Sequence, residues 1–125
     1  MKLILIIALF VAPAFAFGQD VLRPADYYKK LKEEGKDVQL VDVRTPEEYK
    51  EGHIKDFINI NFNGTDFQKD IMALDKSKAV FLYCRSGNRS QQTQRVLKKM
   101  GFTTVIDLHG GFEAWKGGGF PVKKD

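Results

Sequence analysis

The stretch that decides the fold is Ala79-Val80-Phe81-Leu82-Tyr83-Cys84-Arg85-Ser86-Gly87-Asn88-Arg89-Ser90. Residues 79–83 are all apolar or aromatic and predict a strand that is buried on both faces. Gly87 permits a tight turn, and a helix is predicted from about Asn88 to Met100. A buried strand that passes through a short polar loop into a helix is typical of a parallel α/β sheet.

Strand and helix patterns alternate on both sides of this stretch. Pro24 fits the first turn of a helix that ends near Glu34, and Thr45-Pro46 begins a short helix that Gly52 stops. Further strands are predicted at residues 38–43, 57–60 and 103–108, and further helices at residues 66–74 and 112–116. We therefore expect an α/β fold, with a parallel sheet of about five short strands and helices on both faces.

The composition is typical of one soluble globular domain. The chain has 125 residues, of which 43% are hydrophobic and 29% charged, enough for one modest core and no second domain. The formal net charge is +4, but lysines and acids are interleaved and form no basic stripe. Nucleic acid is therefore not an expected partner.

The N-terminal segment has the layout of a secretory signal peptide. A lysine precedes an uncharged apolar run over residues 3–17. A retained transmembrane anchor is the alternative, but a spanning helix needs about 20 apolar residues, and a proline interrupts this shorter run. We expect cleavage after Ala16 or Gly18, so that residues 1–16 are the signal peptide and residues 17–125 a single domain. The mature protein is then exported, to a periplasm or outside the cell, without membrane attachment.

Cys84 is the only cysteine, so the chain forms no internal disulfide. A lone cysteine in an exported protein is paired between molecules, buried as a small hydrophobe, or reactive. Arg85, Arg89 and the amides of the loop favour an anion, so we interpret Cys84 as an exposed, reactive thiolate. The two histidines, His53 and His109, have no zinc-ligand spacing to Cys84, and no metal site is expected.

Four landmarks resemble the rhodanese family of sulfurtransferases. They are Asp42-Val43-Arg44 with Glu51-Gly52-His53-Ile54, the loop Cys84-Arg85-Ser86-Gly87-Asn88-Arg89-Ser90, Gly101-Phe102, and Gly110-Gly111-Phe112-Glu113-Ala114-Trp115. The resemblance spans about residues 24–122 and implies the rhodanese-like α/β fold. With its expected export signal, the chain is similar to single-domain periplasmic rhodaneses.

The resemblance implies a sulfur transfer that needs no metal or organic cofactor. Cys84 would take sulfane sulfur from a small anionic donor such as thiosulfate and form a persulfide. It would then pass the sulfur to cyanide, a thiol or a protein acceptor. The donor and the persulfide would be held by the loop residues Arg85, Ser86, Gly87, Asn88, Arg89 and Ser90. A preformed thiolate would need no general base.

The charge of the loop also suggests which donor is preferred. Thiosulfate is a dianion and mercaptopyruvate a monoanion, so two arginines favour thiosulfate. We expect Arg85 to lie at the mouth of the site and Arg89 to be held partly by the loop itself.

Other landmark residues are expected to support the site. Asp42 and Arg44 end a predicted strand, and Arg44 is interpreted as pairing with nearby acids, with direct contact to the donor as the alternative. His53 is interpreted as a hydrogen-bonded structural histidine, although it could titrate near the site. Trp115 is expected to anchor the core beneath the last helix.

Two segments depart from the family pattern. Lys55-Asp56-Phe57 stands where the family has proline-glycine-alanine, which puts the shape of that turn in doubt. Gln94 occupies a helix position that is usually small and apolar, which predicts looser packing behind the loop.

Two other functions remain open. Related cysteine phosphatases also place a cysteine and an arginine around an anion loop, but with five residues between them, whereas four separate Cys84 from Arg89. A non-enzymatic rhodanese-like module, which docks a partner or binds a persulfide without turnover, is the second alternative. The intact Cys84 disfavours it.

Overall fold

The computed structural model describes residues 20–124, which form a five-stranded parallel sheet with helices around it. The strands lie in the order β1-β5-β4-β2-β3. Their bounds are β1 Val21–Leu22, β2 Val38–Asp42, β3 Ile58–Asn59, β4 Ala79–Tyr83 and β5 Val105–Leu108. The predicted parallel α/β sheet is confirmed. Only β1 has no counterpart among the predicted elements, because two residues carry no periodic pattern.

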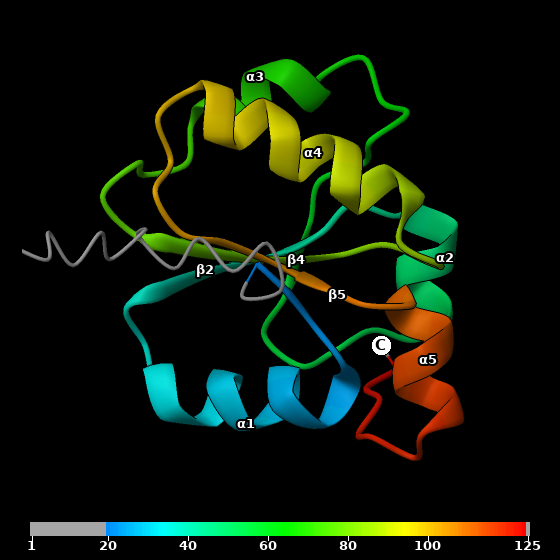
Figure 1. The fold of residues 1–125 in the computed structure, drawn as a ribbon. Coiled ribbons are helices and arrows are strands. Elements are labelled where there is room, and N and C mark those ends of the chain that lie inside the picture. Colours follow the sequence, from blue (N-terminus) through cyan, green and yellow to red (C-terminus); the bar gives the residue numbers. More distant parts are fainter. Residues whose placement is uncertain (1–19, 125) are drawn as a thin grey trace, which may run out of the picture.

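Helices cover both faces of the sheet (Figure 1). One face carries α1 (Pro24–Glu34), and the opposite face carries α3 (Phe67–Met72) and α4 (Asn88–Lys99). The short helices α2 (Pro46–Glu51) and α5 (Gly111–Gly117) lie together beside the end of the sheet from which β4 leads into α4. The segments that follow β2, β4 and β5 therefore meet at one edge, where sites form in open α/β sheets.

Alternate residues of β4 pack against opposite layers of helices. Val80 and Leu82 belong to the apolar cluster beneath α4, whereas Phe81 and Tyr83 belong to the cluster shared with α1. Trp115 of α5 is fully buried in the second cluster, with its ring centroid 6.2 Å from that of Tyr27. The expectation that Trp115 anchors the core is confirmed.

The ends of the helices follow the sequence signals. Thr45 caps α2 by accepting a hydrogen bond from the backbone of Glu48, whose side chain accepts one from the Thr45 backbone in return. The residue after α1 is Gly35, at a φ of 66° that a side chain would strain. These local rules explain why the helix limits agree with the predicted ones to within a few residues.

Gln94 corrects one expectation about packing. Its Nε2 donates hydrogen bonds of 2.8 Å to the carbonyl oxygens of Asp20 and Val105, so it ties α4 to the segment before β1 and to β5. A long polar side chain therefore satisfies two backbone acceptors where looser packing was predicted.

The segment Lys55-Asp56-Phe57 is the other departure from the family pattern. Asp56 adopts a positive φ of 71° there, and the next residue, Phe57, is buried.

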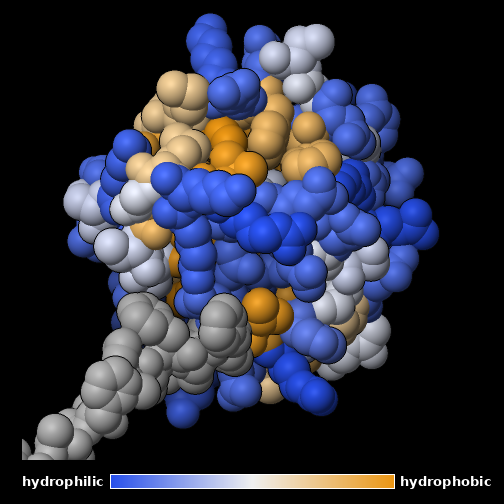
Figure 2. All heavy atoms as spheres, turned by 45° about the horizontal axis from the view of Figure 1, so that its top comes forward, coloured by the Kyte–Doolittle hydropathy of each residue, from blue (hydrophilic) through white to orange (hydrophobic). Residues whose placement is uncertain are grey.

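The layer of α3 and α4 exposes apolar side chains. Figure 2 shows hydrophobic surface on this side among mostly hydrophilic residues. Met72 of α3 is 60% exposed and Val96 of α4 is 40% exposed. The next residue of α4, Leu97, is fully buried.

The expected signal peptide, residues 1–16, lies outside the described residues. Among residues 20–124, no helix is long and apolar enough to span a membrane.

The start of α5 is bonded to the loop after β4. The backbone N–H of Phe112 donates to the Cys84 carbonyl oxygen at 2.8 Å, and that of Glu113 donates to the Arg85 carbonyl oxygen at 3.0 Å. Gly111 makes this approach possible, since its φ is 62° and a Cβ there would lie 2.6 Å from both carbonyl oxygens. We call this pair of hydrogen bonds the α5 clamp.

We predict that Gly111→Ala lowers the free energy of unfolding by about 3 kcal/mol or more, because it adds both backbone strain and a steric clash. Gly35→Ala is the matched control, since Gly35 has a similar φ of 66° but no atom near the position of a Cβ. We expect it to cost only the backbone strain, about 1–2 kcal/mol, because no clash is added. Urea unfolding of both variants measures the difference, and equal losses would show that the close approach at Gly111 contributes nothing.

Candidate active site

The Cys84 sulfur lies at the start of the loop that joins β4 to α4. It accepts a hydrogen bond of 3.0 Å from the backbone N–H of Gly87 and one of 3.3 Å from the hydroxyl of Ser90. Gly87 has a φ of 115°, which turns its N–H back toward the sulfur and begins α4. Two donors and the N-terminus of a 12-residue helix favour negative charge on this sulfur.

Cys84 is buried, with only 1% of its surface exposed, so the expectation of an exposed thiol is wrong. The physical reason is that Cys84 continues the buried pattern of β4 and joins the apolar cluster beneath α4, while the α5 clamp covers its carbonyl group. Replacing its sulfur by a hydroxyl therefore places a polar group in a buried position and is expected to reduce stability.

The other loop residues take different positions. Ser86 and Asn88 are exposed, and the Asn88 side chain accepts a hydrogen bond from Gln92. Ser90 is fully buried and donates to the sulfur. The structure thus brings Gly87 and Ser90 to Cys84, while the side chains of Ser86 and Asn88 remain on the outside of the loop.

Asp42 and Arg44 form a buried ion pair next to the loop. Arg44 donates from Nε and Nη2 to the Asp42 carboxylate at 2.8–3.1 Å, and Nη2 also donates to the Gly52 carbonyl oxygen. The guanidinium lies 4.1 Å from the centroid of the Phe112 ring. Arg44 therefore links β2, α2 and α5, and the interpretation that it pairs with a nearby acid is confirmed.

His53 is buried against α2. Its ring stacks on that of Tyr49 with centroids 3.8 Å apart, and its Nδ1 lies 3.0 Å from the Tyr49 carbonyl oxygen. Its backbone pairs with that of Lys123 near the C-terminus. These contacts agree with the interpretation of His53 as a hydrogen-bonded structural residue.

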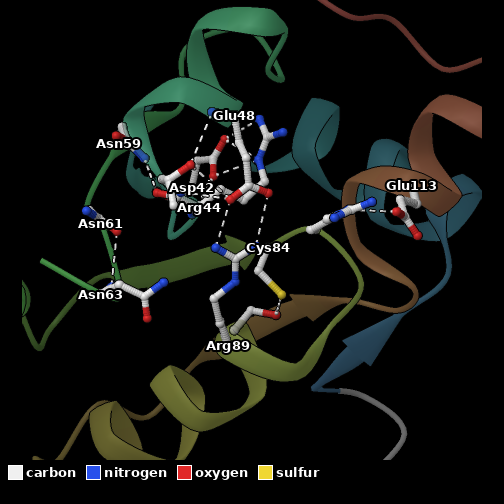
Figure 3. A network of polar contacts seen from close by, with 12 residues as sticks. Asp42, Arg44, Glu48, Asn59, Asn61, Asn63, Cys84, Arg89 and Glu113 are labelled. Atoms are coloured by element: carbon white, nitrogen blue, oxygen red, sulfur yellow. Dashed lines mark hydrogen bonds and ion pairs between the residues drawn. The ribbon is translucent and has the colours of Figure 1, made fainter.

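Arg89 is held by α2 rather than by its own loop, as Figure 3 shows. Its two terminal nitrogens donate to the Glu48 carboxylate at 2.9 and 3.0 Å. This bidentate contact with Arg89, aided by Thr45, lowers the pKa of Glu48 to about 2. Arg89 was expected to be held partly by its own loop, and this was wrong, because its partner is Glu48 of α2. An ion pair between residues 41 positions apart leaves no local sequence pattern that could predict it.

Arg85 also has a carboxylate partner. Its Nε donates to Glu113 of α5 at 2.8 Å, but the two side chains are 65% and 57% exposed. An ion pair this exposed contributes little stability, so Arg85 can exchange Glu113 for another anion. Arg85 lines a cavity of about 420 Å³ at this edge, together with Arg44, Phe112 and Lys116.

These geometries agree with what the family comparison finds. Residues 24–117 match the model of the rhodanese-like domain. The chain belongs to this family. The matched range contains the Cys84 loop, the Asp42–Arg44 pair and the α5 clamp, so these three features lie within the rhodanese-like domain.

Several relatives and one solved structure show the extent of the similarity. The chain is 40% identical over 86 residues to the uncharacterized protein YqhL of Bacillus subtilis, covering 69% of this chain and 66% of YqhL. It is 37% identical to a sulfurtransferase of Allochromatium vinosum over 69% of this chain and 78% of that protein. It is 35% identical to thiosulfate sulfurtransferase GlpE of Pseudomonas syringae pv. syringae, over 74% and 84%. A rhodanese-related protein of Thermoplasma volcanium superposes with a TM-score of 0.73 at 28% identity, covering 84% of this chain and 98% of that one.

The sequence did not reveal the carboxylates that pair with the loop arginines. Glu48 lies in the short helix predicted to begin at Thr45-Pro46, without any role assigned to it, and Glu113 was named only as part of a landmark. Within residues 20–124, no cluster of three or more His, Cys, Asp or Glu side chains could hold a metal ion.

Proposed function

We propose that the protein is a sulfurtransferase that carries sulfane sulfur from thiosulfate, or a similar donor, to a thiol or cyanide as a Cys84 persulfide. The observation that carries the proposal is the pair of donors on the Cys84 sulfur, from Gly87 and Ser90. Relatives named sulfurtransferase and thiosulfate sulfurtransferase, at 37% and 35% identity, support the same reaction class.

The reaction follows from a thiolate held by hydrogen-bond donors. The Cys84 thiolate attacks the sulfane sulfur of thiosulfate, the sulfur–sulfur bond of the donor breaks, and sulfite leaves with the electron pair. The loop amides and the start of α4 stabilise the negative charge of the persulfide. A cyanide ion or a thiolate then attacks the terminal sulfur, and Cys84 leaves as the thiolate.

Arg89 argues against a phosphatase. Both of its terminal nitrogens donate to Glu48, so its forked end is directed at α2 and a phosphate group would have to displace this carboxylate to bind there. The four-residue spacing between Cys84 and Arg89 also gives fewer loop amides than the five-residue spacing of the related phosphatases.

Two assays on the same protein test the proposed reaction. We expect sulfite release from thiosulfate in the presence of cyanide, no hydrolysis of an aryl phosphate, and loss of sulfite release in Cys84→Ser. Because Cys84 is buried, thermal unfolding must show that Cys84→Ser is folded at the assay temperature. Hydrolysis of the phosphate would favour the phosphatase, and absence of both activities would favour a binding module.

Arg85 and Glu113 together test the preference for an anionic donor. Arg85→Ala removes the exposed cation and should lower kcat/KM for thiosulfate about tenfold, as for one charge-assisted contact. Glu113→Gln frees Arg85 and should raise kcat/KM by about twofold to fivefold.

Mercaptopyruvate serves as the control donor for these two variants. In both variants, kcat/KM for the dianion thiosulfate should change more than kcat/KM for the monoanion mercaptopyruvate. Raised salt should reduce this difference between the two donors. Equal losses for both donors in Arg85→Ala would assign Arg85 a structural role, and a wild-type preference for mercaptopyruvate would contradict the charge argument.

The compartment belongs to the same proposal. Residues 1–16 are predicted to direct export, which would place the mature sulfurtransferase in a periplasm or outside the cell. The support for this is the apolar N-terminal run alone.

A further inference from the structure

Asp107 is a buried acid that the mechanism above does not use. Its side chain has no exposed surface, and within residues 20–124 neither carboxyl oxygen accepts a hydrogen bond of good geometry. Asp42, the other fully buried acid among these residues, accepts three side-chain hydrogen bonds from Arg44. Burying a carboxyl group without well-formed hydrogen bonds costs free energy of folding. The position of Asp107 in the fold therefore points to a functional role.

The register of the sheet places Asp107 on the side of the reactive loop. Asp107 of β5 pairs with Leu82 of β4, two residues before Cys84. Leu82 packs in the cluster beneath α4, as does Val105, two residues before Asp107. Because alternate residues of a strand share a face, the carboxyl group points toward α4, as Cys84 does.

Ser90 lies between the acid and the sulfur. Its hydroxyl is 3.3 Å from Cys84 Sγ and 3.3 Å from the Gly87 carbonyl oxygen, and it also faces the carboxyl group of Asp107. A hydroxyl group has a single proton to donate, so these three acceptors compete for it. Burial raises the pKa of Asp107 to about 7, although Ser90 and the Leu108 backbone lower it in part.

Few other ionisable groups of the described residues lie close to Asp107. The end of β4 contributes Cys84, and α1 contributes Tyr27, whose hydroxyl donates to the Leu82 carbonyl oxygen. The segment before β1 contributes Asp20, whose carboxylate pairs with Lys98 of α4 and whose carbonyl oxygen accepts from the Asp107 N–H. The buried residues of α4 are uncharged: Ser90, Thr93, Gln94 and Leu97.

We propose that Asp107 is a positioning residue for Cys84, which controls through Ser90 how strongly the sulfur is stabilised as an anion. The proposal rests on the proposed function, since it concerns the nucleophile of that reaction. Asp107 touches neither donor nor acceptor and acts only through the Ser90 hydroxyl and its own charge.

The two protonation states of Asp107 have opposite effects on the sulfur. When Asp107 is protonated, its O–H donates to the Ser90 oxygen, and the Ser90 hydroxyl donates to Cys84 Sγ. When Asp107 releases its proton to solvent, the carboxylate accepts the Ser90 hydroxyl instead, and the sulfur keeps only the Gly87 N–H. The carboxylate is also a like charge close to the thiolate, which disfavours the thiolate further.

The test measures formation of the thiolate directly. Cys84 is the only thiol, so the ultraviolet absorbance of the thiolate, with Cys84→Ser as the blank, follows its titration without any sulfur donor. In Asp107→Asn the amide donates permanently to Ser90, and we expect the thiolate to form at a pH about one unit lower than in the wild type. Asp75→Asn, which removes an exposed acid bonded to Ser77, is the matched control and should leave the titration unchanged.

A double variant tests whether Ser90 carries the effect. In the Ser90→Ala background, Asp107→Asn should shift the titration by less than half as much, because only the direct charge repulsion remains. Equal titration curves of the wild type and Asp107→Asn would overturn the proposal, and so would an undiminished shift in the Ser90→Ala background.

Two further measurements keep the test decisive. If Asp107→Asn does not fold, Asp107→Ser replaces it with a smaller neutral side chain and the same expectation. Sulfite release from thiosulfate is recorded across the same pH range, where the wild type should lose rate relative to Asp107→Asn above about pH 7. A titration shift without any sulfite release would reject the sulfur-transfer reaction and leave the coupling of Asp107 to Cys84 intact.

Discussion

The α5 clamp is the constraint on which the rest of the site depends. Two backbone N–H groups at the start of α5 bind the carbonyl oxygens of Cys84 and Arg85. With these carbonyl groups turned toward α5, the Gly87 N–H at the other end of the loop bonds to the sulfur. The clamp requires Gly111, and it also explains why Cys84 is buried although it lies in a loop.

The positive character of the site comes from the backbone more than from the arginines. Each of the three arginines near Cys84 has a carboxylate partner: Arg44 with Asp42, Arg85 with Glu113, and Arg89 with Glu48. Arg89 thereby holds the start of α4 against α2, and Arg44 links β2 to the end of α2 and to α5, whereas the exposed Arg85 can still bind an incoming anion. Arg44 and Arg89 therefore stabilise the structure, whereas Arg85 is available to bind a donor. Asp107, in contrast, is a buried acid that has no arginine as its partner in the part of the chain that the structure describes.

The sequence predicted the fold and the loop that contains Cys84 because both depend on local patterns. The apolar run before Cys84, the glycine after it and the proline of α2 fix strand, turn and helix by themselves. Such local rules could not predict the carboxylate partners of Arg85 and Arg89, because these partners lie in helices 28 and 41 positions away in the sequence. Burial of Cys84 was missed for a related reason: the clamp that covers it depends on where α5 packs, and Gly111 carried no sign of its contact in the sequence.

The mass of the protein after brief incubation with thiosulfate tests the central claim most directly. A persulfide on Cys84 adds one sulfur atom, about 32 Da, which a reducing agent removes. The account predicts this adduct on the peptide that contains Cys84 and its absence from folded Cys84→Ser. An unchanged mass of the wild-type protein, or an adduct that persists in Cys84→Ser, would contradict it.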